Sequence, residues 1–142
     1  MEVGVSSVIV LEQSDRFCRE LKTEWSRQAI PGGGVGEIDE IESAGSVSEV
    51  FSLADSSRRG VVVADLAAGQ PDVLRLLERW DRGWPIVVIG SLDTGELEWP
   101  LRELGATTVL FEPVTPSRLL AMCQRVLKNV TGPSGLHAPT GG

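Results

Sequence analysis

Short runs of apolar residues recur along the chain, and each is followed by a segment whose apolar residues lie three or four positions apart. A short continuous apolar run is typical of a buried strand, and the wider spacing is typical of a helix with one buried face. The pattern predicts strands at residues 5–12, 37–43, 60–65, 85–90 and 107–111. The second strand is weaker and alternates between apolar and polar residues, which indicates the edge of a sheet.

Residues that start or cap helices follow the predicted strands. They are Gln13 or Ser14 for the first helix, Ser46 with Glu49 as a capping box for the second, Pro71 for the third, and Thr115 with Pro116 for the fifth. The fourth helix is expected at residues 96–104, where Pro100 should shorten or distort it. Regular alternation of strand and helix predicts a parallel sheet with helices on both faces.

Length and composition fit one domain that needs no metal or disulfide to hold it. The chain has 142 residues, of which 42% are hydrophobic, and this is enough for a core of its own. Residues 1–130 form the predicted domain, and residues 131–142, rich in Gly and Pro, form a disordered tail or a linker. Cys18 and Cys123 fall on the apolar sides of predicted helices and are expected to be buried free thiols.

Charge and hydropathy exclude several classes of function. The net charge is −7, from 13 basic and 20 acidic residues with no basic cluster, so direct binding to nucleic acid is not expected. No apolar run approaches the roughly 20 residues of a membrane span, and the N-terminus lacks the basic region of a secretory signal. The sequence therefore predicts a cytoplasmic protein that does not enter a membrane. The only histidine, His137, lies in the tail, which excludes a histidine-dependent catalytic triad.

Two acidic residues lie at the ends of predicted buried strands. Asp65 ends the third strand, and Glu112 follows the fifth. The carboxyl ends of parallel strands meet at one edge of a sheet, where open parallel sheets bind ligands, so these two carboxylates are expected to lie together. The glycine run at 32–36 resembles a phosphate loop, but it comes after a helix and before a strand, so a plain connection is expected.

The order and spacing of these segments resemble the receiver domain of bacterial two-component response regulators, the CheY-like domain, over residues 6–130. The resemblance rests on residues 8–12, 64–66, 72, 74–77, 84–89 and 104–114. The last of these segments is similar to the family's Gly-Ala…Lys-Pro-Phe stretch. The resemblance implies a flavodoxin-like, doubly wound sheet of five parallel strands in the order 2-1-3-4-5, with five helices in a single domain.

The resemblance also implies chemistry at particular positions. Asp65 falls where receivers carry the aspartate that accepts a phosphoryl group, a carboxylate nucleophile that forms an acyl phosphate. Glu12 and Gln13 fall where receivers place an acidic pair that holds Mg²⁺, so a neutral amide replaces one carboxylate. Because Mg²⁺ is usually bound through one or two carboxylates and phosphate oxygens, Glu12 and Asp65 could still hold it weakly.

Other receiver positions carry different residue types in this chain. The hydroxyl position after the fourth strand is Gly90, with Ser91 one residue further on, and the aromatic switch position is Val109. Glu112 stands where receivers carry a lysine that pairs with the phosphoryl group, so attraction becomes repulsion. Pro113 follows as a candidate for a cis peptide bond or a loop.

The fourth helix, fifth strand and fifth helix correspond to the face that receivers use to dimerise or to meet partners. Leu97, Trp99 and Leu101 can form an apolar anchor there, and a homodimer through this face is one expectation. The alternative is that Trp99 folds down to fill space left by an irregular helix. The other tryptophans are predicted to pack in the interior: Trp25, Trp80 and Trp84.

The favoured interpretation is a pseudo-receiver, a non-enzymatic interaction module of two-component-type signalling that needs no cofactor and binds another signalling protein or an output domain. One alternative is a working receiver in which Asp65 accepts phosphate and Glu12 and Ser91 compensate. A second is a small flavodoxin-like cofactor or nucleotide binder, although the acidic segment 12–15 would repel phosphate. Asp65 itself can be a structural cap for the next loop, or can form a metal site with Glu12 and Glu112. Three carboxylates at one edge should raise at least one carboxyl pKa unless a cation binds.

Overall fold

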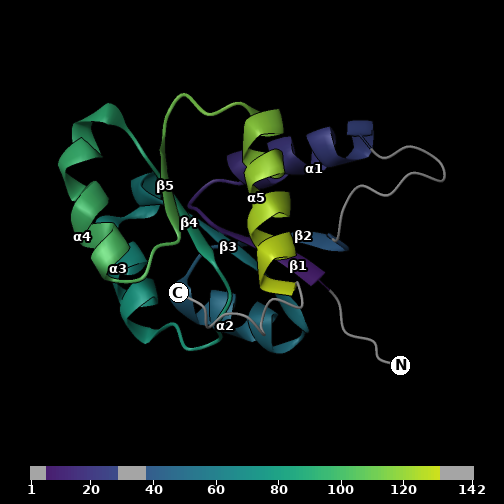
Figure 1. Cartoon of the computed structure of the whole chain (residues 1–142), viewed down its shortest axis with the longest axis horizontal. Coiled ribbons are helices and arrows are strands. Elements are labelled where there is room, and N and C mark those ends of the chain that lie inside the picture. Colours follow the sequence, from purple (N-terminus) through teal and green to yellow (C-terminus); the bar gives the residue numbers. More distant parts are fainter. Residues whose placement is uncertain (1–5, 29–37, 132–142) are drawn as a thin grey trace.

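Five parallel strands form one sheet in the order β2-β1-β3-β4-β5 (Figure 1). The structure is a computed structural model, and it describes residues 6–28 and 38–131. The strands are β1 (Ser6–Leu11), β2 (Glu40–Ala44), β3 (Arg59–Asp65), β4 (Ile86–Gly90) and β5 (Thr108–Phe111). The strand order and the flavodoxin-like, doubly wound class are confirmed. Two residues predicted to lie in strands, 5 and 37, are outside the described residues.

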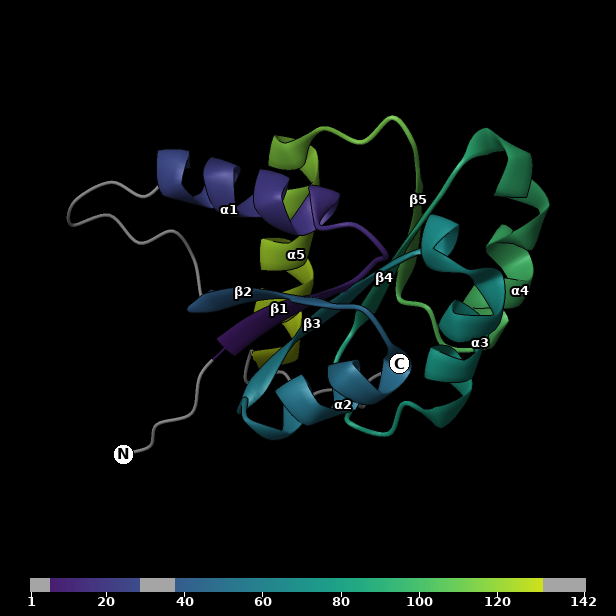
Figure 2. The ribbon, with the colours of Figure 1, turned by 180° about the vertical axis from the view of Figure 1, so that it is seen from behind.

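Helices cover both faces of the sheet. They are α1 (Arg16–Gln28), α2 (Val47–Asp55), α3 (Gln70–Arg79), α4 (Glu98–Glu103) and α5 (Pro116–Thr131), with 3₁₀ turns η1 (Leu66–Ala68) and η2 (Leu92–Leu97). Helices α1 and α5 lie on one face, and α2, α3 and α4 lie on the other, as opposite views show (Figure 1 and Figure 2). This is the arrangement that alternating strands and helices predict.

The strand residues divide between the two helical layers by alternation. In β3, Val61 and Val63 pack in the core beneath α1 and α5. Their neighbours Val62 and Ala64 pack in the core beneath α2, α3 and α4. Both faces of this strand are therefore buried, which explains why its sequence is continuously apolar. The edge strand β2 instead keeps Glu40 exposed, in agreement with its mixed sequence.

The fourth helix is short and begins irregularly, as its proline predicts. The chain passes through η2 and then forms only six α-helical residues in α4. Pro100 is the third residue of α4, where a missing N–H group removes no helical hydrogen bond. The predicted range of 96–104 thus covers the end of η2 and the whole of α4.

The capping box predicted for the second helix is half right. Ser46 Oγ accepts a hydrogen bond from the N–H of Glu49 at 3.2 Å. The side chain of Glu49 does not return to Ser46, because its Oε1 accepts from the N–H of Gly45 at 2.9 Å. The cap predicted for the fifth helix is confirmed, since Thr115 Oγ1 accepts from the N–H of Arg118 at 3.2 Å.

Three tryptophans and both cysteines pack in the interior, as predicted. Trp25, Trp80 and Trp84 are partly buried against the core. The indole N–H of Trp80 donates to the carbonyl oxygen of Trp84 at 3.1 Å. Cys18 and Cys123 are buried free thiols, and burial raises the pKa of the Cys123 thiol to about 12. A thiol with so high a pKa is chemically inert at neutral pH.

Within residues 6–28 and 38–131, no helix combines the length and the apolar character needed to cross a membrane. The glycine run at 32–36, His137 and residues 132–142 lie outside the described residues. Helix α5 continues to Thr131, one residue beyond the predicted end of the domain.

Candidate functional site

The carboxyl ends of β3, β4 and β5 enclose a small pocket. Strand pairing sets Asp65 beside Ile89 and Gly90 beside Phe111, so the residues that follow these strands meet at one edge. The pocket has a volume of about 90 Å³ and is lined by Asp65, Leu66, Ala67, Ile89, Gly90, Ser91, Thr94 and Glu112. Four of the predicted site residues are therefore brought together: Asp65, Gly90, Ser91 and Glu112.

Asp65 is buried, with 9% of its surface exposed, and it caps the turn η1 that follows β3. Its Oδ1 atom accepts a hydrogen bond from the N–H of Ala67 at 3.0 Å. Burial raises the pKa of this carboxyl; the Ala67 hydrogen bond opposes the rise, and the Glu112 carboxylate adds to it. The raised pKa predicted from sequence is confirmed, although burial contributes more than repulsion between carboxylates.

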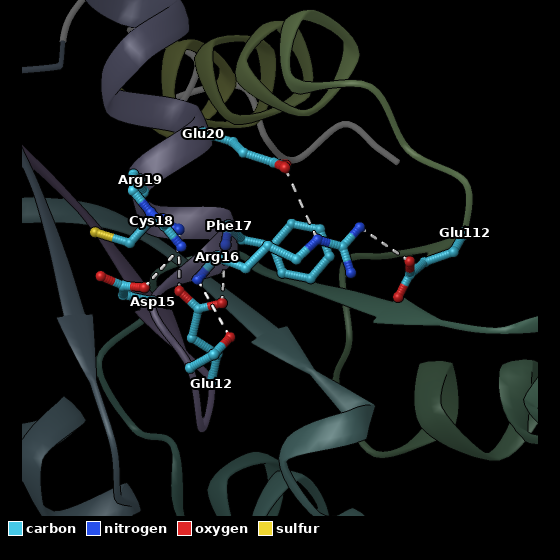
Figure 3. Close-up of polar contacts among 9 residues, drawn as sticks. Glu12, Asp15, Arg16, Phe17, Cys18, Arg19, Glu20 and Glu112 are labelled. Atoms are coloured by element: carbon cyan, nitrogen blue, oxygen red, sulfur yellow. Dashed lines mark hydrogen bonds and ion pairs between the residues drawn. The ribbon is translucent and has the colours of Figure 1, made fainter.

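Glu12 does not line the pocket, because its side chain caps α1 instead. It is almost fully buried, at 1% exposed. Its Oε1 accepts from the N–H of Phe17 at 2.9 Å, and its Oε2 accepts from the N–H of Cys18 at 3.0 Å (Figure 3). Burial raises the pKa of the Glu12 carboxyl, against the effect of these two hydrogen bonds. Both oxygens thus serve the first turn of a helix, whose N–H groups lack partners within the helix.

The carboxylates expected to share a metal site have different surroundings in the structure, and weak binding of Mg²⁺ by Glu12 and Asp65 stays a prediction. Gln13, the second member of the expected acidic pair, is exposed in the connection between β1 and α1. In the described part of the chain, no three His, Cys, Asp or Glu side chains gather in a way that could hold a metal ion. Both Glu12 oxygens accept backbone N–H groups of α1, and Glu12 does not line the pocket that contains Asp65 and Glu112, although its carboxylate is near enough to Asp65 to feel its charge.

Glu112 is paired with a cation that the sequence interpretation missed. Arg16 reaches from α1 to Glu112, with 3.1 Å between its Nη2 atom and Oε1 (Figure 3). The same guanidinium lies 4.4 Å above the ring centre of Phe17 and 3.9 Å from a carboxylate oxygen of Glu20. Arg16 and Glu112 are both partly exposed, and such pairs stabilise a fold by at most about 1 kcal/mol. Arg16 nevertheless offsets part of the negative charge near Asp65.

The position of Arg16 carries a signal that could have revealed this pair. Helix α1 begins at Arg16, later than the predicted start at Gln13 or Ser14, and its first turn contains no acidic residue. A cation at the start of a helix faces the positive end of the helix dipole, where an acid is favoured. An arginine there needs an acidic partner, which Glu112 supplies from 96 residues further along the chain.

A second residue missed from sequence, Thr94, occupies the space beside Gly90. A Cβ atom on Gly90 would lie 2.6 Å from Thr94 Oγ1, which is too close for real atoms. Thr94 Oγ1 accepts from the N–H of Ser91 at 2.9 Å and donates to the carbonyl oxygen of Ser91 at 2.8 Å. The hydroxyl at this edge therefore comes from η2, four residues beyond the position that the resemblance indicated.

The remaining positions from the resemblance lie on β5 and after it. Val109 is buried in the core beneath α2, α3 and α4. The nearest aromatic side chain is that of Phe111, two residues later on the same face of β5, 3.5 Å from the position of a Cβ on Gly90. The peptide bond between Glu112 and Pro113 is cis, as Pro113 was expected to allow.

Of the predicted apolar anchor, only Trp99 is at the surface. The Trp99 side chain is 69% exposed, so it does not fold down into space left by an irregular helix. Leu101 is 1% exposed and belongs to the core, because it lies on the inner side of α4. Leu97 is half-buried and packs against the same core. The anchor predicted at Leu97, Trp99 and Leu101 is therefore wrong for Leu101 and reduces to a single exposed indole.

Solved structures match the chain, although no model of a known protein family and no curated protein does. The chemotaxis response regulator CheY4 of Vibrio cholerae has a TM-score of 0.65 and 21% identity, over 87% of this chain and 99% of that one. The receiver domain of the Francisella response regulator 1452 has a TM-score of 0.69 and 18% identity, over 88% of this chain and 98% of that one. The chain has the receiver-domain fold.

A third neighbour with the receiver fold carries a different description. It represents a family of redox sensors in the streptococci that evolved from two-component response regulators. Its TM-score is 0.66 at 12% identity, over 87% of this chain and 52% of that one. At such identities the likeness concerns the fold alone, and the chemistry of this chain depends on its own side chains.

The first prediction concerns the capping role of Glu12 in this receiver fold. Glu12→Ala leaves the buried N–H groups of Phe17 and Cys18 without acceptors, so we expect the free energy of unfolding to fall by about 2–3 kcal/mol. The matched control is Glu49→Ala, since Glu49 also accepts from a backbone N–H before a helix but is exposed, and should cost less than about 1 kcal/mol. Urea unfolding measures both variants, and equal losses would contradict the buried capping role.

The second prediction concerns the buried carboxyl of Asp65. Because its pKa is raised in the folded protein, ionisation at neutral pH opposes folding, and this loss disappears as pH falls through the raised pKa. Asp65→Asn keeps an oxygen for the Ala67 N–H, so we expect it to stabilise the protein by about 1 kcal/mol at pH 7. The gain should vanish near pH 4 in thermal unfolding followed by circular dichroism. A destabilised variant at pH 7 would contradict this account.

Proposed function

We propose that this chain is a pseudo-receiver, a non-enzymatic module that binds another signalling protein or an output domain without phosphorylation of Asp65. The observation that carries the proposal is the placement of Glu12. Its carboxylate is buried, each of its oxygens accepts a backbone N–H group of α1, and it does not line the pocket that contains Asp65. The receiver fold is present, and the side chains at its functional edge serve the structure of the chain itself.

The geometry around Asp65 does not favour Mg²⁺. This ion prefers several oxygen ligands in a near-octahedral arrangement and gives up its water reluctantly. Both oxygens of Glu12 accept backbone hydrogen bonds, and Gln13 carries no charge. Residues 6–28 and 38–131 contain no group of three His, Cys, Asp or Glu side chains that could hold a metal ion. Asp65 would have to bind the ion with little help from its neighbours.

The charge near Asp65 also opposes an incoming phosphoryl group. Glu112 lines the same pocket and would repel added negative charge. Arg16 forms an ion pair with Glu112 at 3.1 Å, so the two side chains together carry almost no net charge. Arg16 is not among the residues that line the pocket. Transfer of a phosphoryl group to Asp65 would replace one negative charge by about two beside the Glu112 carboxylate, and no lysine or arginine is among the described residues that line the pocket.

The pocket volume, the net charge of the chain and one of the similar solved structures bear on the remaining parts of the proposal. The pocket of about 90 Å³ is smaller than the roughly 300–1,000 Å³ of typical cofactor sites, which disfavours a flavin or nucleotide at the ends of β3, β4 and β5. A net charge of −7 disfavours nucleic acid, and we propose a cytoplasmic location. The streptococcal redox sensors, described as evolved from response regulators, support the idea that this fold can carry other signals.

The third prediction tests the loss of phosphorylation. We expect no saturable shift of the Asp65, Glu12 or Ser91 amides in two-dimensional NMR when the chain is titrated with millimolar Mg²⁺ and beryllofluoride, a mimic of the acyl phosphate. Asp65→Asn is the matched control, and a phosphorylatable receiver serves as the positive control in the same buffer. Saturable shifts that are present in the natural chain and absent from the variant would make it a working receiver and would overturn the proposal.

The interaction surface is proposed to lie over α4, β5 and α5, with Trp99 as its anchor. A 69% exposed indole contributes little to the stability of its own chain, and tryptophan is the residue type most often found at the energetic centre of an interface. Its neighbour Leu101 supports α4 from inside the core. We propose a homodimer through this face as one form of the interaction.

The fourth prediction separates an interface role of Trp99 from a structural one. Trp99→Ala should weaken dimerisation by about 30-fold or more, as expected for truncation of a central anchor, and should change the free energy of unfolding by less than about 0.5 kcal/mol. Sedimentation velocity over a range of concentrations measures the first quantity and urea unfolding the second. Glu78→Ala, on the exposed side of α3, is the surface control. A monomer at every concentration would remove the homodimer and leave a different protein as the partner.

A further inference from the structure

The pocket at the ends of β3, β4 and β5 has the walls of a site for a small organic cation. We propose that it binds an alkylammonium group, supplied by a lysine side chain of a partner protein. The inference deepens the proposed function and rests on it for the source of the ammonium group. The binding chemistry rests on the pocket alone.

The polar walls offer three acceptors that are not fully used. Asp65 is nine-tenths buried, and only its Oδ1 has a hydrogen-bond partner among the described residues. Glu112 binds Arg16 through Oε1, so its second oxygen is available. Thr94 Oγ1 accepts one hydrogen bond and donates one, which leaves a lone pair. An ammonium group has three N–H donors and no acceptor, so its donors match these three atoms in number and kind.

The other walls suit the methylene chain that carries an ammonium group. Leu66, Ala67 and Ile89 line the pocket. A lysine buries its methylene stem along apolar surface while its charged end meets polar groups. The volume of about 90 Å³ has room for an ammonium and a few methylenes. A larger planar group would not fill the site as well.

The local charge balance also calls for one cation. With Asp65 and Glu112 ionised and Arg16 paired to Glu112, the groups around the pocket carry one net negative charge. A buried charge is costly unless a partner of opposite sign joins it. One ammonium group would complete the balance, whereas a divalent metal would exceed it and would need more oxygen ligands than the pocket presents.

The chain cannot fill this site with a lysine of its own in the described structure. Its two lysines are Lys22 and Lys128, on α1 and α5, and neither lines the pocket. Lys22 instead lines a separate hollow between α1 and β2. A lysine therefore has to come from another molecule, in agreement with a module whose role is to bind a protein.

The fifth prediction tests the site with butylammonium chloride and its neutral counterpart, 1-butanol, on the full chain at constant ionic strength. Butylammonium should give saturable NMR shifts at the amides of Asp65, Ala67, Thr94 and Glu112, and 1-butanol should not. Asp65→Asn and Glu112→Gln should each weaken the binding at least tenfold. Glu78→Gln removes an equal charge from an exposed site on α3 and should bind as the natural chain does.

The source of the ammonium group is tested with two capped tripeptides, one with lysine and one with norleucine between glycines. Binding of the lysine peptide at least as tight as that of butylammonium supports a partner side chain. Binding of butylammonium without binding of the lysine peptide overturns the proposal of a partner lysine, because the pocket would then admit only free amines. No shift with either probe, or equal binding by the Asp65→Asn variant, overturns the site.

This outcome is separable from the proposed function. If the amines fail to bind and beryllofluoride also fails, the pseudo-receiver proposal stands and only the ammonium site is lost. If beryllofluoride binds at Asp65, the proposed function fails whatever the amines do.

Discussion

A carboxylate at the end of a buried parallel strand has to find hydrogen-bond donors or a counter-charge, because unpaired polar groups are costly away from water. Three such carboxylates meet this requirement from within the chain. Glu12, after β1, takes two N–H groups of α1, and Asp65, at the end of β3, takes the N–H of Ala67. Glu112, after β5, takes the guanidinium of Arg16. These three separate sets of contacts fix the positions of the carboxylates at the carboxyl ends of the strands.

The contacts of the three carboxylates differ in strength, and this difference determines which side chains can move when a ligand binds. The Glu12 hydrogen bonds are buried, and their loss is expected to cost about 2–3 kcal/mol, so Glu12 is firmly held. The Arg16–Glu112 pair is partly exposed and contributes at most about 1 kcal/mol, so it can rearrange when a ligand arrives. The carboxyl edge of the sheet is therefore held more firmly at Glu12, after β1, than at Glu112, which lines the pocket after β5.

The fold was predictable because burial of both faces of a parallel sheet leaves its mark directly on the sequence. Continuous apolar runs such as 60–65 give the central strands, and the alternating run gives the edge strand β2. The helix around Trp99 was harder, since six residues after a 3₁₀ turn are too few to show which side faces the core, and Leu101 was misplaced on the surface. Short irregular segments carry too little periodicity for that distinction.

The sequence predicted which strand-end residues lie in the candidate site, but not which other side chains contact them. The strand ends predicted that Asp65 and Glu112 lie together, and both line the pocket, with Gly90, which the resemblance had indicated. Arg16 and Glu112 are 96 residues apart, so the lack of an acid in the first turn of α1 indicates that Arg16 favours an acidic partner but does not say which one. The residues that differ from the receiver pattern also fit their neighbours in this chain. Gly90→Ser would set a Cβ 2.6 Å from Thr94 Oγ1, and Glu112→Lys would set a second cation beside Arg16. Because each residue fits its partner, a single substitution toward the receiver pattern meets a clash or a repulsion. Recovery of the hydroxyl and of the lysine is therefore expected to require paired changes, at Gly90 with Thr94 and at Glu112 with Arg16.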